Sequence, residues 1–488
     1  MISLLQLPWS RYGLCELKTR LVSHRHDWLA AGLVGMVLVA FYSLLFRYAI
    51  DLPITDDYHA TLHFLLQIDA QPANWLSLLF EQHNEHRILI SRALALLEYK
   101  LLGGVNFRYL LLAQTLFLLG LAWAVIRLGQ TVGVRWSNRR LVPVFLLLFS
   151  LNTWETYLFV SGGSQSYPAL LGMTFALLCL HRACQPMGQR QQVGWLSGAA
   201  FWAIWASVSF GAGVLVWPAG LLLLALQRRW RMAKLWLGLT GGMALLYSYH
   251  YHSSALSAHP TRILAENGWV FLRFALSFPG ASWQIPWPNP AIWRWNLAFC
   301  YGIGLVSWLY FIYLTLNGYA RRQPLLYSFI ALFFAVDLLI AFSRCRAGVN
   351  TAFSSRYQIL SAMLLIGQYL TLHQQSAALP RAIRQRWLVG ATLLLTAVFG
   401  CSGWYQCQNI AMQEVEKIRG MQQWLTIRAQ TLYIGPEHQA SASQILRACQ
   451  ARIYRPTPDV IGCNLPIIVG SVRQRTWPSA PIRQVSRR

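Results

Sequence analysis

The sequence predicts an all-α, polytopic membrane protein, and two properties of the whole chain indicate this class. Of the 488 residues, 56% are hydrophobic and 12% are charged, with a mean hydropathy of +0.39. A soluble globular protein has about a quarter of its residues charged. Apolar runs of about 20 residues also recur along the chain, which is the length that an α-helix needs to cross a bilayer. A soluble enzyme, a disordered chain and a fibrous repeat are thereby excluded.

The apolar runs predict about eleven transmembrane helices. The stretch 194–227 is too long for one crossing and is divided at Ser207–Gly213, where serine and glycine residues allow the chain to turn. The predicted spans lie at about 29–47, 109–127, 141–160, 167–183, 194–208, 212–227, 233–250, 297–316, 325–342, 357–373 and 387–404.

The charge of the chain indicates its orientation. The net charge is +25. In a soluble protein this charge would suggest a nucleic-acid partner, but none is expected for a membrane protein. Here the basic residues first indicate loops that stay in the cytoplasm, and second a partner that carries phosphate. Basic residues cluster in the N-terminal tail and then in alternate loops, so we predict a cytoplasmic N-terminus. Residues 1–28 lack the form of a cleavable signal peptide. We therefore expect a multi-pass protein of the cytoplasmic membrane.

The chain is predicted to have two regions. Residues 1–404 form the transmembrane domain, which includes a first outer loop at 48–108, and residues 405–488 form a small, basic extracytoplasmic tail. In that tail Cys449 and Cys463 can form a disulfide if the compartment is oxidising, with Cys401 and Cys407 as alternative partners.

The first outer loop is unusually acidic. Seven of the sixteen acidic residues lie between Asp51 and Glu98. The helical spacing of its leucine and phenylalanine residues predicts two amphipathic surface helices, at Asp57–Ile68 and Asn74–Leu102.

Two adjacent carboxylates, Asp56 and Asp57, follow the first span. Adjacent carboxylates near a membrane repel each other and must be solvated or paired. One of them can act as a general base for an acceptor hydroxyl while the other positions it or holds a cation. The alternative is a helix N-cap, with Thr55 or Asp56 capping a helix that begins at Asp57.

A second polar group lies at residues 81–87 of the same loop. On a helix His83, His86 and Arg87 share a face, and Glu81 lies one turn from Glu85. A His-x-x-His pair with a carboxylate can hold a divalent metal ion, but the sequence offers no third ligand at diagnostic spacing, and no cofactor is assigned. We favour a polar cluster that shapes the substrate pocket over the alternative of a solvated helix face.

Further candidates lie at the outer ends of later spans. Glu155 follows Trp154 at a predicted membrane edge and is interpreted either as a site wall or as an interfacial anchor. His250 belongs to an aromatic segment that can stack on sugar or form an interfacial belt. Asp337, inside a span, is expected to pair with an outer arginine.

A short outer loop carries three arginines and no acid. Arg344, Arg346 and Arg356, which precedes Tyr357, break the positive-inside pattern. Arginine presents a fork of donors that matches phosphate oxygens. These residues predict a site for a lipid phosphate or diphosphate, with anionic headgroups as the alternative.

This organisation resembles the GT-C-fold, polyprenyl-phosphate-dependent membrane glycosyltransferases of bacteria. The likeness rests on the Asp56-Asp57 pair in the first outer loop, on that loop's amphipathic helices and on a later outer Arg356-Tyr357 that opens a span, and it covers most of residues 29–404. The resemblance implies that Asp57 or Asp56 is the base and that Arg356, with Arg344 or Arg346, meets the donor phosphate. His83, Glu85, His86 and Arg87 would then line the acceptor side. The partners it implies are a polyprenyl-phosphate sugar donor, membrane lipids and a glycan, lipid or protein acceptor.

Two other functions remain open from the sequence. A lipid-linked oligosaccharide polymerase or ligase also uses outer arginines, but without an acidic first loop. A flippase or transporter of lipid-linked sugars would place charges within its spans and repeat one half in the other, and the sequence has no visible repeat.

Overall fold

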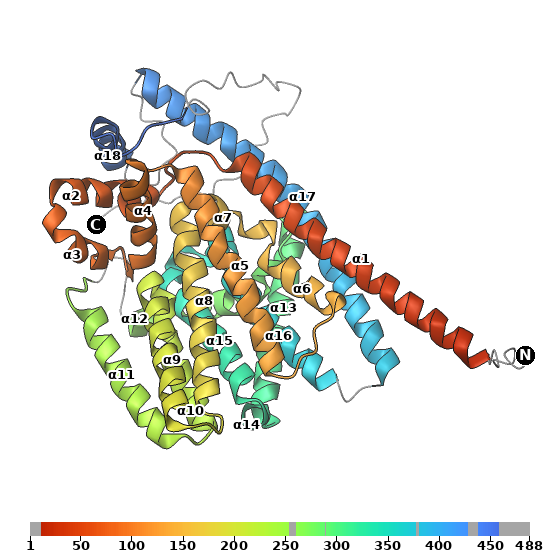
Figure 1. The fold of residues 1–488 in the computed structure, drawn as a ribbon. Helices are drawn as coiled ribbons and strands as arrows, with labels where there is room; N and C mark the ends of the chain where they lie inside the picture. Colours follow the sequence, from red (N-terminus) through yellow and green to blue (C-terminus); the bar gives the residue numbers. More distant parts are fainter. Residues whose placement is uncertain (1–10, 253–259, 288, 377–379, 428–437, 458–488) are drawn as a thin grey trace, which may run out of the picture.

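The computed structural model is a helical bundle in which all eleven predicted segments are helical (Figure 1). It describes residues 11–252, 260–287, 289–376, 380–427 and 438–457. The helices of the bundle are α1 (Arg11–Tyr48), α5 (Phe107–Thr131), α6 (Asn138–Leu148), α7 (Trp154–Leu158), α8 (Val160–Ala183), α9 (Gln189–Ser209), α10 (Val216–Leu226), α11 (Trp230–Ser248), α12 (Pro260–Ser277), α13 (Pro290–Leu316), α14 (Tyr319–Arg322), α15 (Pro324–Arg344), α16 (Ser355–Gln375) and α17 (Arg381–Ile427). The predicted division of 194–227 is confirmed, because α9 ends at Ser209 and α10 begins at Val216. The segment 141–160 is shared by α6 and α7, and α12 is a helix that the sequence analysis did not predict.

Six helical segments among the described residues are long and apolar enough to cross a membrane. This is the composition expected of an all-α membrane protein. The segments are Asp27–Tyr48, Phe107–Thr131, Asn138–Leu158, Ile292–Leu316, Pro324–Ala347 and Gln385–Gln422.

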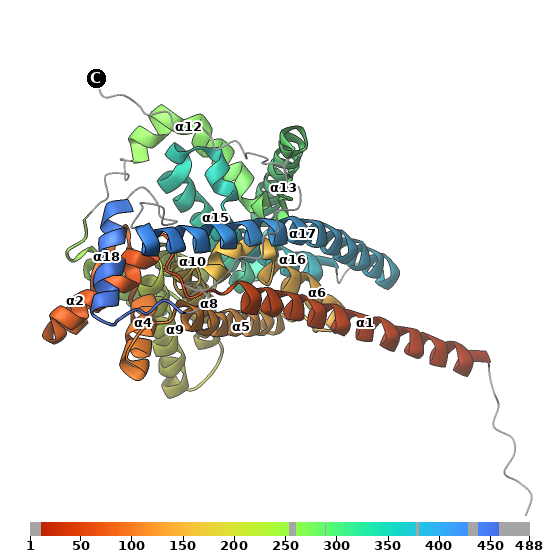
Figure 2. The ribbon, with the colours of Figure 1, turned by 90° about the horizontal axis from the view of Figure 1, so that it is seen from above.

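Small residues allow the central helices to pack closely. A Cβ atom on Gly172 of α8 would lie 2.8 Å from the backbone oxygen of Trp202 in α9, so only glycine permits this approach. Close backbone contact through small residues is a common way for helices to associate in membranes. Figure 2 shows α1 and α17 beside each other along one side of the bundle, where Arg47 and Glu414 form an ion pair of 2.9 Å.

The first outer loop folds into short elements at one end of the bundle (Figure 1). The first predicted helix is present as a π-helical turn, η1 (Tyr58–His63), followed by α2 (Phe64–Ala70). The second, predicted as one helix over Asn74–Leu102, is wrong in its middle. After the 3₁₀ turn η2 (Pro72–Asn74), the chain forms α3 (Trp75–Phe80), a hairpin of β1 (Gln82–His83) and β2 (His86–Arg87), and then α4 (Leu89–Leu102).

Tertiary contacts explain the break between α3 and α4. The guanidinium of Arg92, which is 1% exposed, donates to the carbonyls of Leu78 and Glu81 at 2.6 and 2.7 Å. Carbonyls at the end of a helix have no partner within it, so these bonds favour ending α3 at Phe80. The spacing of apolar residues contains no signal of this contact.

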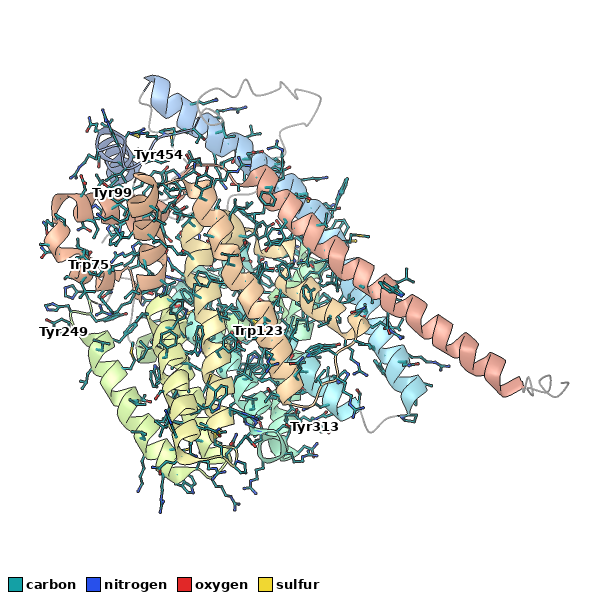
Figure 3. All side chains as sticks on the ribbon, in the orientation of Figure 1. Trp75, Tyr99, Trp123, Tyr249, Tyr313 and Tyr454 are labelled. Carbon is teal, nitrogen blue, oxygen red and sulfur yellow. The ribbon has the colours of Figure 1, made fainter. Side chains whose placement is uncertain are left out.

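The predicted boundary at residue 404 falls inside a continuous helix, because α17 runs on to Ile427. The chain then returns as α18 (His438–Gln450), which packs on η1 of the first outer loop. Tyr454, labelled in Figure 3, donates its hydroxyl to the carbonyl of Asp51 at 2.7 Å. This part of the tail is therefore joined to the first outer loop. Cys449 lies on α18, whereas Cys463 lies outside the described residues.

Candidate functional site

One pocket gathers residues from several parts of the chain that the sequence analysis singled out. It lies between the first outer loop, the junction of α7 and α8, the turn after α9, and the segment that joins α15 to α16. Its empty space is about 680 Å³, which includes open solvent at the mouth. The lining residues are Thr55, Asp56, His83, Asn84, His86, Glu155, Phe159, Ser161, Gly162, Gln165, Ser166, Phe210, Arg344, Arg356 and Tyr357.

Asp56 is the carboxylate that the first outer loop presents to this pocket. The preceding Thr55 has a φ of +48°, a conformation that is costly for a β-branched residue and is often found at functional sites. Among the residues that the structure describes, the half-buried Asp56 carboxylate has no hydrogen-bond or ion-pair partner. It lies close enough to His86 and Arg356 to interact electrostatically with both.

Asp57 does not line the pocket, so the structure separates the two predicted bases. Its side chain is 1% exposed, and its two oxygens accept hydrogen bonds from the amides of Ile54 and Ser161 at 3.1 and 2.8 Å. Burial outweighs these hydrogen bonds and raises the pKa of Asp57 from 3.8 to about 7. Asp57 thus joins the first outer loop to the start of α8, and Asp56 is the member of the pair that lines the pocket.

The hairpin places two histidines on the pocket wall. His83 and His86 are cross-strand partners, and Asn84 in the turn between them has a φ of +50°, which asparagine tolerates well. Burial lowers the pKa of both histidines, that of His83 to about 3. Both imidazoles are therefore neutral near pH 7. Gly211 leaves room for His86, because a Cβ atom there would lie 2.3 Å from its Nδ1.

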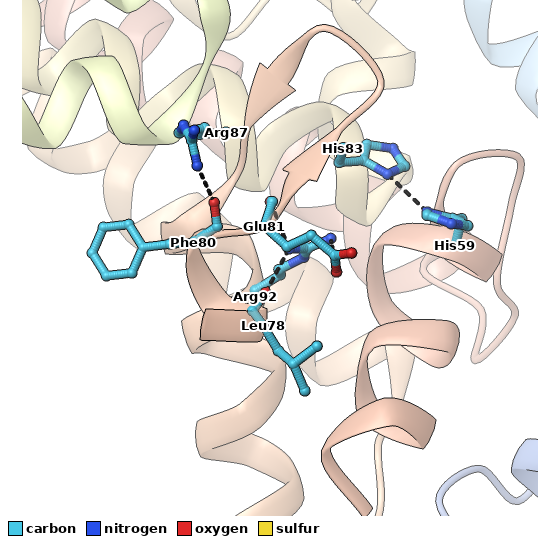
Figure 4. A network of polar contacts seen from close by, with 7 residues as sticks. All are labelled: His59, Leu78, Phe80, Glu81, His83, Arg87 and Arg92. Atoms are coloured by element: carbon cyan, nitrogen blue, oxygen red, sulfur yellow. Dashed lines mark hydrogen bonds and ion pairs between the residues drawn. The ribbon is translucent and has the colours of Figure 1, made fainter. Parts of the chain in front are cut away.

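Arg87 does not line the pocket, so the structure does not bring it together with the predicted acceptor-side histidines that do. Its guanidinium donates to the carbonyl of Phe80 (Figure 4) and to the carbonyls of Tyr247 and Tyr249. These bonds tie the hairpin to α3 and to the end of α11. Three carbonyl acceptors for one guanidinium indicate a structural role for Arg87.

The last residue of α15, Arg344, supplies one side of a basic wall. Arg344 donates its Nε–H to the hydroxyl of Tyr357 at 3.1 Å. Its Nη2 atom lies 3.8 Å from a carboxylate oxygen of Glu85 at the tip of the hairpin. Glu85 does not line the pocket itself, but it lies beside one of the two guanidinium groups that do.

Glu155 joins α7 to the first turn of α16. One carboxylate oxygen accepts hydrogen bonds from the Ser354 hydroxyl at 3.0 Å and the Arg356 amide at 2.9 Å, while the other lies 3.7 Å from the Arg356 guanidinium. In return, the Glu155 amide donates to the Ser355 hydroxyl at 2.8 Å. A carboxylate at the N-terminus of a helix satisfies free amides and interacts favourably with the helix dipole. Glu155 therefore lines the pocket and holds the first turn of α16.

Three further residues that the sequence singled out also lie outside the pocket. Arg346 is paired with Glu266 at 3.2 Å, so its predicted contact with donor phosphate is not supported. His250 is exposed and packs edge-on against Tyr249 with 4.3 Å between ring centroids. Asp337 is fully buried and is paired with no arginine in the described chain, so the expected pairing with an arginine is wrong.

Sequence reasoning missed Lys417, which lies on α17 behind the pocket. The residue is 4% exposed, and its Nζ lies 4.6 Å from the ring centroid of Phe159, a pocket-lining residue, and 5.4 Å from that of Trp154. Such cation–π contacts are strongest when the cation is removed from water. The sequence analysis ended the last predicted span at residue 404, whereas α17 continues to Ile427 and so includes Lys417. The pocket-lining residues Phe159, Ser161, Gly162, Ser166 and Phe210 also carried no signal of their own.

The described residues hold no group of three or more histidine, cysteine, aspartate or glutamate side chains placed to bind a metal ion. No protein-family model matches the chain, and neither does any curated protein or solved structure with which it was compared. The fold and the pocket define an all-α chain with helices able to span a membrane and a polar site of mixed charge at one end.

Proposed function

We propose that the protein is an integral-membrane glycosyltransferase, which moves a sugar from a polyprenyl-phosphate donor to a hydroxyl of an envelope glycan, lipid or protein. One observation carries the proposal. The carboxylate of Asp56, which has no partner among the described residues, lines the same pocket as the guanidinium groups of Arg344 and Arg356, with two neutral histidines beside them. A base and a phosphate-binding group are the two functions that this transfer requires.

The reaction needs few steps from the protein. Asp56 takes the proton of the acceptor hydroxyl as its oxygen attacks the anomeric carbon. The bond between that carbon and the phosphate oxygen breaks, with inversion at the carbon, and the bonding electrons leave with the phosphate. Arg344 and Arg356 stabilise the charge that develops on the departing phosphate. His86 offers a hydrogen bond to the sugar or the acceptor, whereas both ring nitrogens of His83 face His59 and Asn84.

The proposal includes a GT-C-like fold with about eleven crossings, a cytoplasmic N-terminus and a pocket on the outer face of the cytoplasmic membrane. The pocket faces the outside of the membrane only if the N-terminus is cytoplasmic. A reporter enzyme fused after residue 105 should therefore report the extracytoplasmic side. A cytoplasmic signal would place the pocket on the wrong face for a donor in the outer leaflet.

Transfer can be measured with the purified protein in liposomes. A panel of undecaprenyl-phosphate hexoses and pentoses, each labelled in the sugar, is mixed with envelope extract as the acceptor source. Asp56→Asn should lower transfer at least about 100-fold, the usual contribution of a general base. Arg356→Gln should lower it by a similar factor, because charge on the departing phosphate is left unbalanced.

Arg346→Gln is the matched control, since Arg346 lies two residues from Arg344 but outside the pocket. It should keep transfer within about twofold of the wild type, as exposed ion pairs contribute little. Full activity of Asp56→Asn would contradict the proposal. Turnover confined to an undecaprenyl-diphosphate oligosaccharide would favour a polymerase or ligase, and movement of intact donor across the bilayer would favour a flippase.

A further inference from the structure

Both arginines of the pocket face a carboxylate of the protein itself. The separations are 3.7 Å for Arg356 and Glu155 and 3.8 Å for Arg344 and Glu85. These distances exceed those of hydrogen bonds, so each carboxylate attracts its guanidinium without occupying the donor fork. The Arg356 side chain is 41% exposed, compared with 17% for Glu155. The arginine is therefore accessible to a second anion.

Glu155 cannot move with Arg356 toward a ligand. Two hydrogen bonds, from the Ser354 hydroxyl and the Arg356 amide, fix one of its oxygens at the first turn of α16. The guanidinium, at the end of a flexible side chain, can turn between the fixed carboxylate and an anion in the pocket. The carboxylate and the anion then compete for the same cation.

We propose that Glu155 is a positioning residue that competes with the donor phosphate for Arg356. This inference rests on the function proposed above and assigns a role to a residue of the same site. With the pocket empty, Glu155 holds the guanidinium at the pocket wall. A lipid phosphate draws the guanidinium away, and Glu155 recovers it when the phosphate product leaves. The carboxylate thereby weakens phosphate binding and speeds product release.

Binding of undecaprenyl phosphate to the purified full-length protein tests this competition. Glu155→Gln keeps an oxygen acceptor for α16 but removes the negative charge. Loss of one like charge a few ångströms from the phosphate should tighten binding about 5- to 10-fold. Donor KM and kcat should both fall, because the product phosphate leaves more slowly. A purely structural role predicts weaker binding and a higher KM.

Three further variants complete the test. Glu266→Gln removes the partner of Arg346 outside the pocket and should leave binding unchanged. Glu85→Gln removes the carboxylate beside Arg344 and leaves the hydrogen bonds of Glu155 to α16 intact. It should also tighten phosphate binding, and it replaces Glu155→Gln as the test of competition between carboxylate and phosphate if that variant does not fold. Combining Glu155→Gln with Arg356→Gln should remove the gain.

Unchanged or weaker binding in folded Glu155→Gln would overturn the inference, as would wild-type protein that binds no undecaprenyl phosphate or binds inorganic phosphate equally well. Wild-type protein that binds undecaprenyl phosphate but transfers no sugar would refute the proposed function. In that case, tighter binding by Glu155→Gln would still support the competition.

Discussion

Asp57 offers the sharpest test of how the site is built. Replacing it with alanine removes the acceptor of two buried amides, those of Ile54 and Ser161, and each unsatisfied donor costs about 1–3 kcal/mol. Part of this cost is offset because a buried carboxyl group is also removed. We therefore expect a loss of about 3 kcal/mol where the first outer loop meets α8, with Asp56 displaced from the pocket as a consequence.

The loss should appear in amide hydrogen exchange of the protein in detergent. A local destabilisation of about 3 kcal/mol corresponds to about 100-fold faster exchange at the Ser161 amide. Exchange in α10, which lies away from the Asp57 contacts, provides the internal control. Exchange at Ser161 within about threefold of the wild-type rate would refute the assignment of these hydrogen bonds as structural.

Asp57 also gives a pH dependence of known sign. Its pKa is about 7 in the folded chain, against an ordinary value of 3.8, so the folded state holds the proton more tightly than the unfolded state. The stabilisation is complete below pH 3.8 and is lost as pH rises through about 7, amounting to at most about 4 kcal/mol. Unfolding of the wild type and of Asp57→Ala should therefore differ more at pH 5 than at pH 8. A pH-independent difference would contradict the elevated pKa.

Two further substitutions test single contacts. Gly211→Ala should lower transfer about 10-fold or more while the protein stays folded, because the new methyl group displaces His86. Gly188→Ala is the control and should leave transfer unchanged, because nothing lies within 4 Å of the added atom. Equal activity of the two variants would refute a role for His86. Tyr454→Phe should lower the free energy of unfolding by about 1 kcal/mol, because a buried hydroxyl loses its hydrogen bond to the first outer loop. Chemical denaturation measures that change, with the exposed Tyr249→Phe as control, and an unchanged midpoint would exclude the bond as a contributor.

The residue types of the site could be predicted from the sequence, but their geometry could not. Scarce acids in a first outer loop and arginines on the side where basic residues are rare pointed to Asp56, Glu155, Arg344 and Arg356, and all four line one pocket. The sequence could not show which of Asp56 and Asp57 lines the pocket, because two adjacent aspartates differ only in their tertiary surroundings. Asp57 is buried by contact with a residue 104 positions away.

Predictions from the spacing of neighbouring residues failed where contacts with residues distant in the sequence determine the local structure. His83, His86 and Arg87 fit one helix face by spacing, yet they lie on a hairpin that Arg87 holds to the backbone of α11. Likewise, Lys417 lies beyond the apolar run of the last predicted span, and only the continuation of α17 brings it behind the pocket.

The sequence by itself determined that this chain is helical and apolar enough for a membrane, because hydropathy and periodicity are properties of consecutive residues. The tertiary structure decided which charged side chains meet. An ion pair or a buried hydrogen bond depends on the few ångströms between atoms from distant segments, and those distances are set only when the helices pack.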